Sequence, residues 1–137
     1  MYGALEVSTS ALVAQRTRLN VIAGNIATKD AYSTDADGNA VPYRRRVALL
    51  AAQAVDGGVG VRVDSIIEDP APFSWRFAPD DNLAWKSGPH KGYVPLSNID
   101  YHTEMVDAMQ AARAYEANIT VMDAVKSMAA TTLRLIA

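Results

Sequence analysis

Paired acidic residues are the first candidates for chemistry in this 137-residue chain. Acid–base catalysis uses two carboxyl groups that are partly buried and held at a defined separation. The pairs Glu68-Asp69 and Asp80-Asp81 both stand beside prolines in loop-like sequence, where aspartate is a favoured turn residue. We therefore predict turn residues at both places and no catalytic site.

Histidine and cysteine chemistry is equally limited. The two histidines, His90 and His102, are too isolated to suggest a metal site or a catalytic triad, so we expect solvated or capping side chains. The chain has no cysteine, which excludes disulfides, thiol catalysis and cysteine-based zinc sites. No cofactor and no metal are therefore expected.

Two further motifs could bind anionic ligands. Residues 57–60 read Gly-Gly-Val-Gly, but they lack both the Lys-Ser/Thr of a phosphate-binding loop and a helix directly afterwards, so a hairpin turn is predicted. Arg44, Arg45 and Arg46 form a basic cluster. On a strand these side chains would alternate between faces and could not bind one ligand together. Their expected role is in ion pairs or interface contacts.

Charge and hydropathy exclude several classes of protein. The formal charge of -2 gives no basic surface for nucleic acid or an anionic membrane, and 50% hydrophobic residues suffice for the core of one domain. No basic and apolar secretory signal opens the chain, and the longest purely apolar run, residues 47–52, is too short to cross a membrane. The chain is either cytoplasmic or exported by a route that needs no such signal.

The element around which the chain is organised is its last third, residues 100–137. Steps of four and three residues predict one long helix with a nearly continuous apolar seam, formed by Tyr101, Met105, Ala108, Ala112, Tyr115, Ile119, Met122, Lys126, Ala129, Leu133 and Ile136. A helix of this length spans roughly 55 Å, too long for a domain of this size to cover alone. Other elements must lie along it.

A second helix is predicted from Ala4 to Ala27. Leu5, Leu12, Leu19 and Ile26 recur every seven residues, which is typical of a helix packed along a partner helix. The natural partner is the C-terminal helix. Further apolar residues lie beside the C-terminal seam, namely Val106, Met109, Val121, Val125 and Leu135.

Between the helices the sequence predicts a polar loop over residues 29–42 and short strands at 43–51, 59–67 and 73–77, with a possible fourth at 93–96. These strands are expected to form one small antiparallel sheet. The predicted fold is α+β, with long paired terminal helices in a coiled-coil-like domain (residues 1–28 and 97–137) and an inserted loop and β region (residues 29–96).

Two tryptophans stand out in the predicted β region. Trp75 on its strand is expected in the core, whereas Trp85 lies in a polar loop and is a candidate interface anchor. Two alternative functions therefore stay open at this point. One is a small binding module that uses the Trp85 loop, and the other is an enzyme that uses Asp80, Asp81 and His90.

Several strings of residues carry a family resemblance. They are residues 10–16, 25–27, 42–45, 68–73, 92–96, 104–107, 113–118 and 126–128. Together they resemble the flagellar axial rod protein family of bacteria, and the Glu-Asp-Pro-Ala-Pro-Phe string at 68–73 favours its FlgC branch, the proximal rod proteins. The most distinctive family positions are Asn25, Glu68, Asp69, Pro70, Phe73, Arg113, Tyr115, Glu116 and Asn118.

The resemblance implies a structural protein without catalytic, cofactor or metal sites. Such a subunit is exported without a cleaved signal by the flagellar type III apparatus and assembles in the periplasm into a helical rod that transmits motor torque. Its implied partners are copies of itself, other proximal and distal rod proteins and a basal-body adapter. The expected assembly residues are Leu5, Leu12, Leu19, Ile26, Met105, Val106, Met109, Tyr115, Ile119, Val121, Met122, Val125, Leu133 and Leu135.

Overall fold

The computed structural model describes residues 2–56 and 58–136 and contains two helices and six strands in that part of the chain. In order they are α1 (Tyr2–Thr28), β1 (Tyr32–Thr34), β2 (Ala40–Pro42), β3 (Arg46–Val55), β4 (Gly58–Glu68), β5 (Ser74–Phe77), β6 (Tyr93–Leu96) and α2 (Tyr101–Ile136). This arrangement confirms the predicted α+β fold with long terminal helices.

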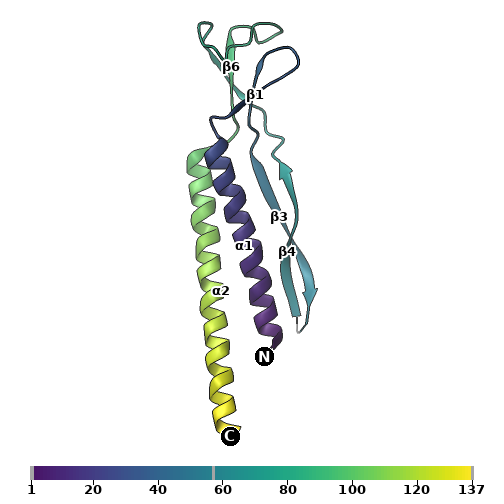
Figure 1. Ribbon diagram of the computed structural model, residues 1–137, viewed down its shortest axis with the longest axis vertical. Coiled ribbons are helices and arrows are strands. Elements are labelled where there is room, and N and C mark those ends of the chain that lie inside the picture. Colours follow the sequence, from purple (N-terminus) through teal and green to yellow (C-terminus); the bar gives the residue numbers. More distant parts are fainter. Residues whose placement is uncertain (1, 57, 137) are drawn as a thin grey trace.

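The molecule has an elongated shaft and a small head (Figure 1). The shaft consists of α1, α2 and the β3–β4 hairpin, and α1 lies between the other two, packed against both. The head consists of β1, β2, β5, β6 and the loop at residues 79–92. Four segments connect the two parts: residues 29–31, 43–46, 69–73 and 97–100. We call the last three of these segments the neck.

The two helices lie antiparallel and differ in length. α1 has 27 residues and α2 has 36, so α2 extends about 14 Å further at 1.5 Å per residue. The C-terminal end of α2 projects beyond the N-terminal end of α1 (Figure 1). As a result, residues 130–135 are all exposed and receive no cover from the rest of the chain.

The seam of α2 against α1 is rotated from the predicted one. Glu104, Ala111 and Val125 are buried at intervals of seven and fourteen residues, whereas the predicted seam residues Met105 and Ile119 are exposed. Tyr101, Lys126 and Leu133 are exposed too, although Ala108, Tyr115, Met122 and Ala129 are half-buried as expected. The prediction failed because the buried series includes Glu104, a charged residue that pairs with Arg45 and that a search for an apolar stripe leaves out.

α1 is buried on two sides because it separates α2 from the hairpin. Ser8, Ala14, Ile22 and Asn25 are its buried residues. The predicted heptad of Leu5, Leu12, Leu19 and Ile26 is half-buried throughout. A helix that packs on two sides shows no single strong apolar stripe. The seven-residue pattern therefore predicts only part of the surface with which α1 contacts α2 and the hairpin.

The β region forms three separate two-stranded antiparallel sheets, so the prediction of one small sheet was wrong. The longest is the β3–β4 hairpin, in which Arg46 pairs with Glu68 and Val55 with Gly58, with an irregularity between Leu49 and Leu50. Its first strand begins at Arg46, because residues 43–45 leave the sheet to form the neck. Of the predicted turn at residues 57–60, residues 58–60 belong to β4, so the prediction was wrong for them, and residue 57 lies outside the described residues.

A close approach fixes the hairpin on α1. The Ser10 hydroxyl accepts a hydrogen bond from the Val61 amide at 3.1 Å and donates one to the Val7 carbonyl at 2.7 Å. Gly60 lies directly against Ser10, and a Cβ atom at this position would fall inside van der Waals distance of the Ser10 side chain. A side chain at residue 60 would therefore push the hairpin away from the helix.

The head is built from two small sheets. The predicted polar loop at residues 29–42 contains β1 and β2, which form a hairpin whose turn is closed by Gly38 at a φ of 78°. The possible fourth strand at residues 93–96 is confirmed as β6, which pairs with β5. Val94 and Pro95 of β6 are fully buried and form the centre of the head.

Candidate assembly surface and polar neck

Large apolar side chains are exposed along the whole of α2. Val106 is 54% exposed near its start, and Leu133 and Leu135 reach 68% and 83% near its end. The exposed apolar residues of α2 are Tyr101, Met105, Val106, Met109, Ile119, Val121, Met128, Leu133 and Leu135. At about 100° per residue, most of them fall on the two flanks of the buried seam, and Val106 and Met109 fall on the face opposite the seam. We call these exposed apolar residues the apolar bands of α2.

Apolar bands of this extent are unusual on a soluble monomer and are typical of surfaces that contact other proteins. Within them, Val106, Met109, Gln110 and Arg113 line a hollow on one side of α2. One expected band residue is absent: Val125 is only 7% exposed because it continues the buried seam. The prediction that Val125 faces a neighbour was therefore wrong.

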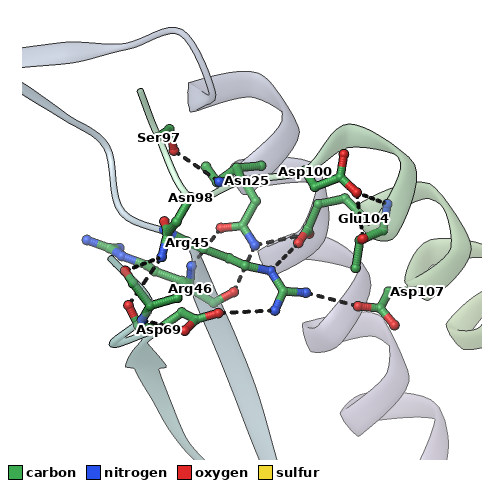
Figure 2. Close-up of polar contacts among 12 residues, drawn as sticks. Asn25, Arg45, Arg46, Asp69, Ser97, Asn98, Asp100, Glu104 and Asp107 are labelled. Carbon is green, nitrogen blue, oxygen red and sulfur yellow. Dashed lines mark hydrogen bonds and ion pairs between the residues drawn. The ribbon is translucent and has the colours of Figure 1, made fainter. Parts of the chain in front are cut away.

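The second notable site is a polar cluster at the neck, centred on Arg45 (Figure 2). Its guanidinium group pairs with carboxylates from two different segments: Glu104 at 2.5 Å and Asp107 at 3.0 Å on α2, and Asp69 at 3.5 Å after β4. Asp107 also pairs with Arg18 of α1 at 3.4 Å. Arg45 thus joins the neck to α2 through charge-assisted hydrogen bonds.

Asn25 joins the end of α1 to the same cluster. Its Nδ2 donates to the Arg46 carbonyl at 2.8 Å and to Glu104 Oε2 at 3.1 Å, and its Oδ1 accepts from the Arg46 amide at 2.9 Å. Asn25 and Glu104 are 2% and 0% exposed. Both groups are buried and both are hydrogen-bonded, as buried polar groups require.

The electrostatics of the neck favour the charged form of Arg45. Burial lowers the pKa of its guanidinium group, but hydrogen bonding and attraction from Glu104, with smaller contributions from Asp69 and Asp107, raise it above the ordinary value overall. Glu104 is a fully buried acid beside this permanent positive charge. Removal of Arg45 would leave Glu104 buried without its counter-charge.

Two of the four distinctive family positions in residues 68–73 make contacts in the neck. Asp69 pairs with Arg45 and accepts a hydrogen bond from the Ala71 amide at 2.9 Å, and the Phe73 ring lies 4.3 Å from the Arg44 guanidinium carbon. Glu68 and Pro70 are exposed.

The family positions on α2 are spread around the helix. Arg113 and Glu116 are exposed, and Tyr115 is half-buried. Asn118 is half-buried and donates to the Ala114 carbonyl at 2.7 Å. The structure therefore does not gather residues 113–118 into one site.

The structure does not bring together Asp80, Asp81 and His90, the residues of the alternative enzyme function. Asp81 pairs with Arg76 at 3.1 Å and accepts from the Leu83 amide, which is the behaviour of a turn residue. His90 stacks on Trp75, with ring centroids 4.0 Å apart. Asp80 is exposed, and no ion pair or hydrogen bond joins it to Asp81 or His90 in the described part of the chain. These contacts offer no acid–base pair.

Trp85 is committed to packing inside the head. Its indole nitrogen donates to the Ala40 carbonyl at 2.8 Å, and its ring meets Trp75 edge to face at 5.0 Å. Trp85 therefore holds the 79–92 loop against β2 and β5, and this packing does not favour a ligand site.

The polar cluster of the neck was not predicted from the sequence. Glu104 lies within one family string, and Arg45 lies within another and is one of three adjacent basic residues. A usable signal was present in hindsight, because an acid on the apolar side of a predicted helix needs a buried cationic partner. Among residues 2–56 and 58–136, no group of acids and histidines could hold a metal ion. No described helix is long and apolar enough to span a membrane.

Two family profiles match the helices that carry the apolar bands and the neck. The profile described as "Flagellar basal body rod FlgEFG protein C-terminal" matches residues 90–135, and the one described as "Flagella basal body rod protein" matches residues 5–27. Together with the long paired terminal helices, these matches define the class: a rod protein of the flagellar basal body.

Curated relatives identify the family within this class. The flagellar basal-body rod protein FlgC of Salmonella typhimurium is 42% identical over 132 residues, which span 95% of this chain and 93% of the relative. FlgC of Borreliella burgdorferi is 37% identical and that of Bacillus subtilis 36%, each over 93% of this chain and 92% of the relative. The chain belongs to the FlgC family of flagellar basal-body rod proteins. This family is structural, so the expected non-catalytic role is confirmed.

Proposed function

We propose that this chain assembles through its terminal helices into the proximal part of the flagellar rod, a helical drive shaft that transmits motor torque. Membership of the FlgC family supports a location in the flagellar basal body and association with other rod components. The mode of assembly is inferred from the surface of α2.

The observation that carries this proposal is the apolar bands of α2. They run the length of the helix, and residues 130–135 extend beyond α1 without cover. A helix that exposes Leu133 and Leu135 to this degree is stabilised when other subunits bury those side chains. Contacts between different faces of identical or related subunits repeat along a helix and generate a filament.

The proposed domain division follows from this role. Residues 1–28 and 97–137 would form the inner helical domain of the rod, and residues 29–96 the outer region. The β3–β4 hairpin belongs to the outer range in sequence but lies along α1 (Figure 1). We therefore expect the hairpin to remain close to the helical core of the rod, with the head further out.

The proposed partners are copies of this chain, other proximal and distal rod proteins and the basal-body adapter. Delivery would be by the flagellar type III export apparatus, without a cleaved signal, into the periplasmic space where the rod assembles. The absence of cysteine suits this route, because an unfolded chain in an oxidising compartment is exposed to unwanted disulfides.

The proposal can be tested by complementing a strain that lacks its own copy of the gene. Val106→Glu places a charge in the exposed apolar band, so we expect a folded monomer, no assembled rod and loss of motility. Gln110→Glu is the matched control, because Gln110 is a polar neighbour in the same hollow. Normal motility in the Val106→Glu strain, with the variant present in purified basal bodies, would contradict assembly through this band.

A further inference from the structure

In the described part of the chain, the head is attached to the shaft through the neck and through residues 29–31, which join α1 to β1. No head strand packs against α1, α2, β3 or β4 there. β2 packs against β6 within the head, and all remaining contacts between elements lie inside the shaft or inside one small sheet. Because no helix or strand of the head packs on the shaft, the orientation of the head depends on the contacts of the connecting segments.

Two side chains bind the same two carbonyl groups in the neck. Arg44 donates to the carbonyls of Asp69 and Ala71 at 3.0 and 2.9 Å, and Asn98 Nδ2 lies 3.3 Å from each of the same oxygens. Asn98 Oδ1 in turn accepts from the Arg45 amide at 2.8 Å. These bonds tie the three neck segments, 43–46, 69–73 and 97–100, to one another.

Arg45 then ties this bundle of segments to the shaft. Its main chain bonds to Asn98 and, through its carbonyl, to the Asp69 amide at 2.8 Å, while its side chain reaches Glu104 and Asp107 on α2. A guanidinium group presents its donors in a planar, rigid fork, so several simultaneous bonds restrict rotation about it. The neighbouring residue Arg46 is held by Asn25 of α1.

We infer that the neck is a clamp in which Arg45 fixes the orientation of the head relative to the shaft. The clamp itself is a property of the single subunit. Its relevance to torque rests on the proposed function, because a subunit that carries load between an inner helical domain and an outer region must resist twisting at their connection.

The test measures the distance between head and shaft in the dilute, purified full-length chain. Because the chain has no cysteine, Ser87→Cys on the head and Ala117→Cys on α2, both exposed, can carry two spin labels. Double electron–electron resonance should give a narrow distance distribution for this parent. With Arg45→Met added, we expect the distribution to widen about twofold at unchanged helix content, as for a released hinge.

The matched control is Arg62→Met, which removes an exposed ion pair with Asp64 on the hairpin, away from the neck. It should leave the distribution unchanged. If Arg45→Met unfolds because Glu104 loses its counter-charge, the double variant Arg45→Met/Glu104→Gln removes the isolated charge and gives the same test. A folded variant with the parent's narrow distribution would overturn the clamp. Because the measurement needs no assembly, that result would leave the proposed rod function untouched.

Discussion

The side-chain amide of Asn25 donates a hydrogen bond to the carboxylate of Glu104 at 3.1 Å, across a separation of 79 residues. Asn25 stands in the last turns of α1 and Glu104 in the first turn of α2, so this buried contact sets the register of the two antiparallel helices at the end nearest the head. Asn25 also hydrogen-bonds to the main-chain amide and carbonyl of Arg46, the first residue of β3 (Figure 2). The same side chain therefore holds the start of the β3–β4 hairpin against the two helices.

Asn25 is therefore expected to be a strong determinant of stability. Asn25→Ala leaves the Arg46 amide and carbonyl and one Glu104 oxygen without this partner, and we expect the free energy of unfolding to fall by about 3 kcal/mol. Chemical denaturation of the purified chain measures the change. Asn20→Ala, at an exposed position of the same helix, is the control. A loss for Asn25→Ala no larger than that of the control would show that these hydrogen bonds do not hold the helices and hairpin together.

Two glycine substitutions should have opposite effects. In Gly60→Ala the new Cβ meets the Ser10 side chain and Val55, so we expect a loss of about 1–3 kcal/mol as the hairpin shifts from α1. In Gly24→Ala the new methyl group meets nothing within 4 Å, and alanine in a helix should add about 0.5–1 kcal/mol. Thermal unfolding of both variants tests this contrast. A stable Gly60→Ala variant would mean that the hairpin is not closely seated on the helix.

Gln15 offers a stabilising change. Its Oε1 is buried and has no hydrogen-bond partner among the described residues, which leaves an acceptor without compensation for its lost water. Gln15→Met keeps a similar length without the polar atom, and we expect a gain of about 1 kcal/mol in the free energy of unfolding. Gln110→Met, at an exposed position of α2, should change stability by less than about 0.5 kcal/mol. A destabilised Gln15→Met variant would indicate that the carbonyl has a hydrogen-bond role.

The N-terminal cap of α2 predicts a specific pH dependence. Hydrogen bonds from the Thr103 hydroxyl and amide to Asp100, with a smaller contribution from His102, lower the pKa of Asp100 below its ordinary value of 3.8. Because the pKa is lower in the folded chain, the charged cap stabilises the helix above pH 3.8 and is lost as the pH falls through the folded-state pKa. The difference in the free energy of unfolding between the parent and Asp100→Ala should therefore shrink as the pH falls below 3.8 and through the folded-state pKa.

Urea denaturation at a series of pH values from neutral to strongly acidic measures this difference. Asp100→Asn serves as the control, because an asparagine caps a helix without a titratable charge. Its stability relative to Asp100→Ala should stay constant across the series. The capping role would be contradicted if the parent and Asp100→Ala differed by the same amount at every pH.

The long-range pattern of the sequence predicted the helices well because each spans many turns of consistent periodicity. α1 and α2 end within two residues of their expected limits. The face of α2 was less predictable, since Glu104 and Ala111 occupy buried positions for reasons that involve Arg45 and close helix packing. Such partners come from distant parts of the chain, and periodicity within one helix carries no information about them.

The β region was harder to predict because its strands are short and their pairing depends on the neck. Arg44 and Arg45 read as strand residues, but their side chains bond to Asp69, Ala71 and the acids of α2 and draw residues 43–45 out of the sheet. Trp85 was predicted to be an interface anchor because it lies in a polar loop of the sequence. Its actual partner, the Ala40 carbonyl, is 45 residues away in sequence and could not be inferred from that loop. The assembly residues themselves remain predictions, since a single subunit shows exposure but not the neighbour that covers it.

The most direct test of assembly through α2 is the accessibility of its apolar bands in the finished rod. Single cysteines at Val121 and Leu133, in an otherwise cysteine-free chain, should react readily with a maleimide reagent in the purified monomer. In basal bodies isolated from motile cells, other subunits should bury both positions and make the reaction much slower. Equal reaction rates in the monomer and in the assembled basal body would contradict assembly through these bands.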